Sequence, residues 1–420
     1  MFHRLGDLLK NNKTLLFILC VSFLLRLLFS IDNIKLLFID IESYDNSARS
    51  ILESGIFSVG AYHPPVYPLF LAFIYKIFGY SYFNVYLIQS VLGTSNTLLI
   101  YLIGKQVFDK RTGNLSAGLS LMYWPLTLYS GILLSEIVFL FFLLLGVYLF
   151  LKGAEDHKTI NFALCGLVLA LSALTRSINL MFICIVPIVY LLMNLKNYKS
   201  IFKNVLVFII VFCLTLAPWV IRNYIMYKAF IPVDTVSGLN LYIGNNDRAE
   251  GSFVDITQDP LFEAGQNDYE DDKILKKAAI EYILSHPLKT FSVTLKRANL
   301  FITNDYHEFD WVLERYMEQN SLIKPLYPIL HRIMYQSDMI FFVLGLLGLL
   351  GFLRSRRGII LGGIIIYYFS LTSLFYIQAR YRLPIMPFMA IAAALSVQGI
   401  FSKLFKGGKG NRVTNIEMQL

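Results

Sequence analysis

Charged residues are scarce in this sequence. Asp, Glu, Lys and Arg together make up 15% of the 420 residues, whereas 56% are hydrophobic and the mean hydropathy is +0.59. So little charge and so much apolar surface exclude an ordinary soluble globular protein. Aromatic residues, at 15%, suit lipid-facing walls and interface belts. The composition therefore predicts a polytopic membrane protein.

The sequence also has few cysteines and no recognisable processing site. The four cysteines are Cys20, Cys165, Cys184 and Cys213. All fall inside apolar runs without paired or metal-ligand spacing, so we interpret them as packing residues. The first apolar run, Leu15–Phe29, follows Lys10 and Lys13 as a signal sequence would, but it contains Arg26 and no small-residue cleavage site follows it. We therefore expect this run to be retained as an anchor.

Ten apolar runs are candidates for membrane-spanning helices. They cover roughly 14–31, 82–103, 115–132, 134–151, 160–175, 178–194, 204–221, 337–353, 358–376 and 383–401. The third to sixth are short enough to tilt or re-enter. Because a bilayer leaves no water for open backbone groups, these runs predict an all-α bundle of about ten helices.

Basic residues gather in the short turns between alternate pairs of these runs. The turns are 105–111, 152–158, 196–203 and 354–357. They account for the net charge of +9 better than nucleic-acid binding does, so membrane lipids are expected partners and nucleic acid is not. The positive-inside rule then predicts a multi-pass protein of the cell membrane, with both termini cytoplasmic and every other connection outside.

This topology divides the chain into three parts. They are the N-terminal transmembrane module 1–222, the outer segment 223–336, and the C-terminal helices and tail 337–420. The outer segment opens with sequence dense in Gly, Asn and Asp, which predicts turns rather than a core. Amphipathic helices are expected at 273–284 and 287–301, and the segment is long enough only for a small outer cap.

The first outer loop, 32–81, is where we expect the chemistry. It is unusually acidic for a membrane connection, with Asp40, Glu42, Asp45, Glu53 and then His63. Two amphipathic helices are predicted in the headgroup plane, at 43–52, with Asp45 on the polar face, and at 66–78. The Pro64-Pro65 pair ends the first and seats the second.

Asp40 and Tyr44 are four residues apart, a spacing that places both side chains on one helical face. A phenol there would orient the carboxylate. The alternative is that Asp40 only caps the helix expected to begin near Ser43.

Six ionisable residues lie at the ends of predicted spans or within them, where they are costly. They are Arg26, Glu136, Arg176, Arg222, Arg380 and Arg382. On the predicted topology all six face the same side as Asp40 and Glu42, an arrangement suited to binding a phosphorylated lipid headgroup and moving a proton. The alternative is that each arginine only reaches toward lipid phosphates. For Arg380 and Arg382, which flank Tyr381, binding is favoured because short outer loops normally avoid positive charge.

Seven stretches, taken in order, resemble a known group of membrane enzymes. They are HPPVYPLFLAFIYKIFG from His63, LSEIVFLFFLLLGVYL from Leu134, ALTRSINL from Ala173, PWVIRN from Pro218, GLNLYIGNN from Gly238, ARYRLPIMPFMAIAA from Ala379, and the first-loop pair Asp40 and Tyr44. The sequence resembles glycosyltransferases of the protein-mannosyltransferase and lipid A aminoarabinose transferase type. The resemblance implies the GT-C fold and transfer of a sugar from a polyprenyl-phosphate donor to an acceptor on the outer face, usually with inversion. The acceptor is then a lipid, a glycan or a protein.

The resemblance also implies roles for individual residues. Asp40 corresponds to the first-loop acid that acts as catalytic base or orients the acceptor, and Glu136 to a second acid at the mouth of a later span. Arg380 and Arg382 resemble the arginines beside the donor phosphate. His63 stands where the aminoarabinose transferases tend to carry Lys, so its charge would depend on pH. Tyr44, Arg26, Arg176, Arg222 and Tyr381 complete the predicted substrate-binding set.

Two alternatives stay open at this point. Asp40 and Glu42 together could bind Mg²⁺ or Mn²⁺ through their oxygens, although no residue is assigned as a metal ligand. A polysaccharide polymerase or an O-antigen-ligase-like protein also has about ten spans and a long outer loop, and would place its essential residues near His286 and His307. A transporter is disfavoured because no span is broken near its midpoint by paired Gly and Pro.

Overall fold

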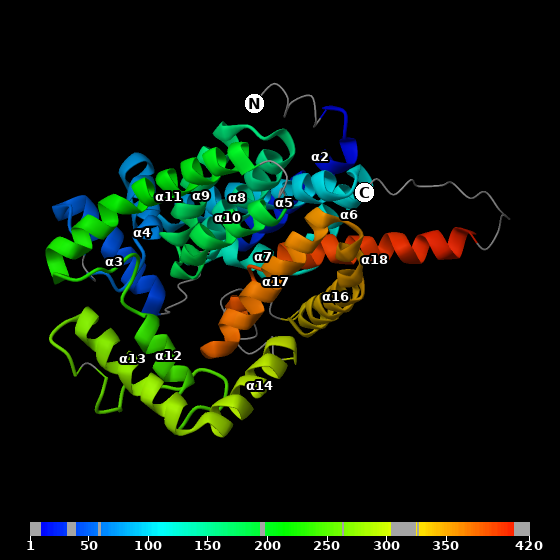
Figure 1. Cartoon of the computed structure of the whole chain (residues 1–420). Helices are drawn as coiled ribbons and strands as arrows, with labels where there is room; N and C mark the ends of the chain where they lie inside the picture. The colour runs from blue at the N-terminus through cyan, green and yellow to red at the C-terminus, as the bar shows by residue number, and fades with distance from the viewer. Residues whose placement is uncertain are drawn as a thin grey trace.

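The computed structural model describes residues 10–31, 39–57, 60–193, 198–262, 264–303, 325 and 327–406. Within these ranges the chain is helical, and its one β contact is an isolated parallel bridge between Ser252 and Ile377 (Figure 1). The prediction of an all-α fold is therefore confirmed.

The apolar runs form a bundle of helices. The helices are α2 (Lys13–Ile31), α5 (Tyr82–Val107), α6 (Lys110–Ser120), α8 (Glu136–Asp156), α9 (Thr159–Ala173), α10 (Phe182–Met193), α11 (Tyr198–Tyr227), α16 (Tyr327–Gly348), α17 (Arg356–Leu374) and α18 (Met386–Lys406). Five stretches of the described chain are long and apolar enough to cross a membrane: Tyr82–Val107, Glu136–Asp156, Ile201–Tyr227, Pro328–Arg354 and Arg356–Leu374. Because several other helices are shorter, the total of ten spans stays a prediction.

Small residues let the bundle helices approach closely. α9 lies between α8 and α11, and a Cβ atom on Gly166 of α9 would stand 2.6 Å from the carbonyl oxygen of Phe208 on α11. Such close backbone approach is the usual way for helices to pack tightly where lipid supplies no hydrophobic driving force.

The predicted span at 115–132 is wrong as a single helix. α6 ends at Ser120, and the chain continues through the short helices α7 (Pro125–Leu128) and η1 (Tyr129–Gly131). Pro125 occupies the first turn of α7, where its missing amide hydrogen costs nothing, but it prevents α6 from continuing. The break is held by α16, because the Trp124 backbone N–H donates to Asp338 Oδ1 at 3.1 Å and Trp124 Nε1 donates to Ser337 Oγ at 2.9 Å.

The first outer loop contains the two predicted helices, α3 (Ile39–Ser54) and α4 (Val66–Phe78). α3 begins four residues earlier than expected and so includes Asp40. The placement of Asp45 on the polar face of an amphipathic helix is wrong. Asp45 is buried between the helices, where it accepts hydrogen bonds from Tyr75 at 2.7 Å and Tyr80 at 2.9 Å.

The outer segment forms a small cap from three helices, α12 (Ser237–Gly244), α13 (Asp268–Ser285) and α14 (Pro287–Thr303). Figure 1 shows them along the lower edge of the molecule, below the bundle. The two amphipathic helices predicted here are confirmed. The prediction of turns alone at the start of the segment is wrong, because α11 continues to Tyr227 and α12 is helical, with Gly238 and Ile243 buried.

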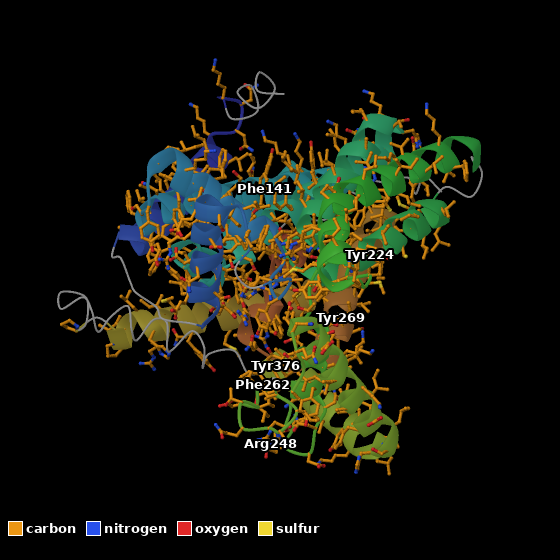
Figure 2. The ribbon with its side chains drawn as sticks, turned by 90° about the vertical axis from the view of Figure 1, so that its left-hand side faces the viewer. Phe141, Tyr224, Arg248, Phe262, Tyr269 and Tyr376 are labelled. Atoms are coloured by element: carbon orange, nitrogen blue, oxygen red, sulfur yellow. The ribbon has the colours of Figure 1, made fainter. Side chains whose placement is uncertain are left out.

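The cap is joined to the bundle beside Tyr376, which follows α17. In Figure 2 the labelled Tyr376 and Phe262 lie close together, with Arg248 farther from the bundle. Tyr376 belongs to the same buried apolar cluster as Ile243 of α12 and Leu275 of α13. The cap therefore packs directly on the loop that precedes Arg380.

Candidate active site

Asp40 and Arg380 form an ion pair, although 340 residues separate them. Arg380 Nη1 donates to Asp40 Oδ2 at 2.7 Å. Asp40 stands in the first turn of α3, where the positive end of the helix dipole favours a carboxylate. Arg380 stands in η5 (Ala379–Arg382), between α17 and α18. The side chain of Asp40 is 32% exposed and that of Arg380 is 21% exposed, so a ligand can still approach the pair.

The charge state of this pair is set by the two partners. Burial alone would raise the pKa of Asp40, but the Arg380 guanidinium outweighs it, so the pKa of Asp40 lies below its usual range. Burial opposes the charge of Arg380 too, and the Asp40 carboxylate keeps the pKa of Arg380 well above its ordinary value. Both side chains are therefore charged at neutral pH.

Glu136 and Arg176 form a second ion pair, with Arg176 Nη1 2.5 Å from Glu136 Oε1. Glu136 opens α8, again at the positive end of a helix, and is almost fully buried. Arg176 follows α9 and precedes η2 (Ser177–Met181). Among the described residues the second oxygen, Glu136 Oε2, has no hydrogen-bond partner. A buried carboxylate oxygen without a donor is unusual in proteins and calls for an explanation.

Tyr381 connects the two pairs. The guanidinium carbons of Arg176 and Arg380 each lie 5.9 Å from the centroid of its ring, within the range of cation–π interactions. Asp40 feels the charge of Arg176, and Glu136 acts on Arg380. Two acids and two arginines from four separate segments thus form one charged cluster.

Aromatic side chains line one side of this cluster. Tyr44 is buried and stacks on His63, with ring centroids 4.2 Å apart. His63 Nε2 is 2.9 Å from Ser43 Oγ. Burial lowers the pKa of His63 to about 4, although Asp40 opposes the shift, so His63 is neutral at neutral pH. Tyr44 therefore packs on His63, and its role in orienting the Asp40 carboxylate stays a prediction. His63, expected to change its charge with pH, brings no positive charge to the site at neutral pH.

Four predicted residues lie elsewhere. Glu42 is exposed. Arg26 is buried and donates to the carbonyl oxygens of Ser22 at 3.0 Å and Leu126 at 3.1 Å. Arg222 lies over the Trp219 ring, with 4.6 Å to its centroid.

Arg382 is the fourth, and it points away from its neighbour Arg380. It is buried, and its guanidinium lies 5.2 Å from the ring centroid of Phe342 and 5.6 Å from that of Phe301. These contacts are with α16 and α14, so Arg382 packs between helices instead of beside Asp40.

Three residues that the sequence did not indicate contribute to the site. Burial raises the pKa of Tyr62 to about 12, and Asp40 adds to the shift. Burial also raises the pKa of Asp234, in the loop before α12, to about 6. Asp268 of α13 accepts hydrogen bonds from the Ala61 backbone N–H at 3.1 Å and from Tyr227 at 2.7 Å, which holds the segment carrying Tyr62. The only sequence signal for Asp234 and Asp268 was the acidic character of the outer segment.

The expected alternative of a metal held by Asp40 and Glu42 fits these positions poorly. Residues two apart on a helix face different sides, and one Asp40 oxygen already binds Arg380. Across the described ranges no group of three or more His, Cys, Asp or Glu side chains is arranged to hold a metal ion. The steps proposed below therefore use no metal.

A family model supports the resemblance seen in the sequence. The model of the family described as dolichyl-phosphate-mannose-protein mannosyltransferase matches residues 62–221. The matched part includes His63, Glu136 and Arg176 and covers less than half of the chain. A search of curated proteins finds no match.

Solved structures of membrane glycosyltransferases share this fold. ArnT from Cupriavidus metallidurans bound to undecaprenyl phosphate has a TM-score of 0.55 and 12% identity, with 94% of this chain and 63% of that chain covered. The oligosaccharyltransferase of Archaeoglobus fulgidus in the apo form has a TM-score of 0.57 and 14% identity, with 95% and 53% covered. Its complex with an inhibitory peptide and a dolichol-phosphate has a TM-score of 0.52 at 14% identity, with 97% and 53% covered.

These matches establish the fold. The chain has the GT-C fold of membrane glycosyltransferases, as predicted, and it spans between half and two thirds of the length of the structures it resembles.

Proposed function

We propose that this protein transfers a sugar from a polyprenyl-phosphate donor to an acceptor hydroxyl on the outer face of the membrane, with inversion at the anomeric carbon. The observation that carries the proposal is the ion pair between Asp40 and Arg380. It places a candidate base 2.7 Å from a guanidinium that can bind the donor phosphate. The undecaprenyl phosphate bound to ArnT and the dolichol-phosphate in the archaeal oligosaccharyltransferase complex support a lipid-phosphate donor here too.

In the proposed reaction one C–O bond is exchanged for another. The acceptor oxygen attacks the anomeric carbon and its proton passes to the Asp40 carboxylate. The bond between that carbon and the phosphate oxygen breaks, and the polyprenyl phosphate leaves with the electron pair. Arg380 stabilises the negative charge of the leaving group, because a guanidinium pairs with phosphate oxygens in a planar, two-pronged geometry.

Donor binding prepares Asp40 for this role. An aspartate held by Arg380 is a weak base, because the ion pair lowers its pKa. When the donor phosphate binds Arg380, the guanidinium is shared between two anions and its hold on Asp40 weakens. The pKa of Asp40 then rises, and the carboxylate becomes able to accept the proton of the acceptor hydroxyl only when a donor is present.

The ion pair of Arg176 and Glu136 supplies a second positive charge and a hydrogen-bond acceptor. Arg176 is directed toward Tyr381, beside Arg380, and provides a second positive charge for the phosphate. Glu136 Oε2 is buried and has no donor among the described residues, and we assign it a hydrogen bond from a sugar hydroxyl once the sugar donor fills the site. Both carboxylates thus have separate proposed tasks, with Asp40 handling the proton and Glu136 orienting the sugar.

The ligase-like and polymerase alternatives would use residues of the late outer segment. His286 lies exposed at the end of α13, stacked on Tyr282 with ring centroids 4.6 Å apart, and His307 lies outside the described residues. The charged cluster instead uses the first outer loop, which favours the transferase. No observation favours a transporter.

The test is transfer by the purified protein in lipid vesicles, offered a panel of undecaprenyl- and dolichyl-phosphate hexoses and pentoses. Release of the polyprenyl phosphate is measured by mass spectrometry, and the anomeric configuration of the product by NMR. We expect Asp40→Asn to lower turnover by about 10²- to 10⁴-fold while undecaprenyl phosphate still binds, because a base is lost at almost constant volume.

Glu42→Gln is the matched control, since Glu42 lies two residues away on the exposed side of α3. It should cost much less than Asp40→Asn. Near wild-type turnover in the Asp40 variant would remove the base assignment and leave Asp40 as a structural partner of Arg380 in the first turn of α3.

A further inference from the structure

α14 has two faces that differ in what covers them. One face packs on protein. Arg297 is fully buried, and the ring of Phe301 lies 5.2 Å from that of Phe369 on α17. The opposite face is an exposed apolar row of large side chains: Leu288, 84% exposed, Phe291, 63%, Leu295, 55%, and Ile302, 47%. Their spacings of three, four and seven residues place them on one side of the helix.

Such a row is unusual on a surface that faces water. Single exposed apolar residues are common in proteins, but a contiguous row of them marks an interaction surface. A further large apolar side chain, Leu284 near the end of α13, is also exposed just before α14 begins.

The position of α14 against α17 indicates what covers the row. α17 is long and apolar enough to cross a membrane, and Phe369 stands five residues, or about 8 Å, before its end at Leu374. Arg297 donates to the carbonyl oxygens of Ser373 at 3.3 Å and Leu374 at 3.2 Å. The last turns of α14 therefore lie at the depth of the final turns of a membrane span.

The span that α14 packs on has exposed apolar side chains of its own. Ile366 and Leu374 of α17 are exposed apolar side chains that lipid must cover. Lys289 and Lys296 lie away from the row, about a third of a turn or more around the helix, and they face acids of the cap. Lys289 Nζ is 3.9 Å from Asp247 Oδ1, and Lys296 Nζ is 3.7 Å from Glu250 Oε2.

We propose that α14 is an interfacial helix that lies in the membrane leaflet on the side of the cap. Leu288, Phe291, Leu295 and Ile302 contact lipid acyl chains, and the cap is anchored to the bilayer as well as to the bundle. The occupant of the row is lipid, and the inference does not depend on the proposed activity.

Spin labels on the full-length protein in nanodiscs of phosphatidylglycerol and phosphatidylcholine test the proposal. Single cysteines replace Phe291, Leu295 or Lys289, in a background in which the four native cysteines are substituted. The replaced side chains are exposed, so the fold is not at stake, and a single symmetrical size-exclusion peak verifies it. Collision with oxygen reports acyl chains, and collision with a water-soluble nickel chelate reports water.

We expect the ratio of oxygen to nickel collision to be severalfold higher at Phe291 and Leu295 than at Lys289. Lipids with spin labels at defined carbon depths should quench a fluorophore at Leu295 and leave one at Lys289 unaffected. Equal access of the nickel chelate to all three positions would overturn the proposal. So would a short label-to-label distance between two copies, because the row would then be covered by a second chain.

Discussion

Arg380 has to serve two anions in turn. In the structure it donates to Asp40, and in the proposed reaction it receives a phosphate. A guanidinium is suited to such sharing, because its five N–H donors are fixed in one plane and it stays charged throughout. A lysine would keep the charge but could hold only one partner in good geometry.

Replacing Arg380 should therefore act on donor binding first. We expect Arg380→Lys to weaken the affinity for undecaprenyl phosphate with partial activity, and Arg380→Ala to weaken it further. Isothermal titration of the detergent-solubilised protein with undecaprenyl phosphate measures the effect.

Arg382 provides the matched control, two residues along the chain. It packs between Phe301 and Phe342, so Arg382→Lys should lower the melting temperature with a smaller change in affinity for undecaprenyl phosphate. If the Arg382 variant loses affinity as strongly as the Arg380 variant, the separate roles given to the two arginines are wrong.

His63 should make stability depend on pH in a defined direction. Its pKa is about 4 in the fold, mainly because of burial, against an ordinary 6.5 for an unfolded chain. Between these values the unfolded chain binds a proton that the folded chain does not. Stability is therefore complete above about pH 6.5 and falls as the pH drops toward 4, by up to about 3 kcal/mol. Melting temperatures from pH 4 to 8, by intrinsic fluorescence, should decline on the acid side.

The His63→Gln variant should lose this part of the acid decline while keeping its melting temperature above pH 7 nearly flat. An identical acid decline in both proteins would assign the effect to other groups.

The sequence predicts single residues well where chemistry alone identifies them. Asp40, Glu136, Arg176 and Arg380 stand out because charge at a membrane is costly, and the structure joins them. Arg382 has the same cost and the same neighbours in sequence, yet it points the other way. Both arginines lie in the same 3₁₀ turn, and only the packing of α14 and α16 decides which one faces Asp40.

At the scale of elements, Asp45 joins α3 to α4. Asp45 is buried, and its carboxylate accepts hydrogen bonds from the hydroxyls of Tyr75 and Tyr80. Arg49 Nε lies 3.1 Å from Asp45 Oδ2, the oxygen that also accepts from Tyr80. Asp45→Asn replaces one acceptor oxygen with an amide that cannot accept. Losing one of the two hydrogen bonds from tyrosine and the ion pair with Arg49 should cost about 1–3 kcal/mol of stability. A lower melting temperature by differential scanning fluorimetry checks this prediction.

The exposed Glu53 on the same helix supplies the control for Asp45, and Glu53→Gln should leave the melting temperature unchanged. A stable Asp45→Asn protein would mean that the pair of helices is held by apolar contacts alone.

Arg297 of α14 joins the cap to the loop that carries Arg380. Its guanidinium donates to the carbonyls that end α17, where the negative end of a helix favours a cation, and also to the Gly244 carbonyl. Three residues after Leu374, the Ile377 backbone N–H donates to the Gly251 carbonyl at 2.9 Å. We expect Arg297→Met to release this loop, lowering both the melting temperature and the affinity for undecaprenyl phosphate.

Two further variants separate positioning from general stability. Arg297→Lys keeps a cation for the carbonyls and should recover part of the affinity, and Lys296→Ala, one residue away and exposed, should change neither quantity. Affinity that survives in Arg297→Met despite a lower melting temperature would reduce Arg297 to a stabilising residue.

Helices with clear start and stop residues in the sequence could be predicted, and helices without such residues could not. α4 begins after Pro65 and ends before Gly79, so both ends were visible in the sequence. The last helical residues of α11 could not be predicted because Pro218 lies inside that helix. The whole of α12 was missed because the Gly, Asn and Asp residues in and around it usually favour turns. The apolar run at 115–132 looked continuous, since its break depends on hydrogen bonds from Trp124 to a distant helix.

At the scale of the whole molecule, three of the basic turns meet on one face. Arg357 Nη1 lies 3.2 Å from Glu155 Oε2, and Gln106 Nε2 donates to the same oxygen at 3.1 Å. These residues belong to the turns at 105–111, 152–158 and 354–357, which the positive-inside rule assigns to the cytoplasm. The charged cluster around Asp40 is built from the other connections, so the two sets of residues should label from opposite sides of the membrane.

Cysteine labelling tests this topology. In a background without the four native cysteines, single cysteines replace Glu53 and Ser285 on the predicted outer side, and Lys110, Lys158 and Arg354 on the inner side. All five side chains are exposed. A membrane-impermeant thiol reagent applied to intact cells should label the first two, and it should spare the other three until the cells are permeabilised.

The outcome at Glu53 and Ser285 decides whether the proposed site faces the outside. Glu53 lies on the helix that carries Asp40, and Ser285 ends the cap helix whose Asp268 holds the Ala61 segment. Both must therefore label together, whatever the number of spans. If both are protected in intact cells while Lys110 and Arg354 react, the orientation is inverted and the donor would have to be used from the cytoplasmic leaflet. Labelling of Glu53 without Ser285 would separate the first outer loop from the cap, and Arg380 would then have no fixed position beside Asp40.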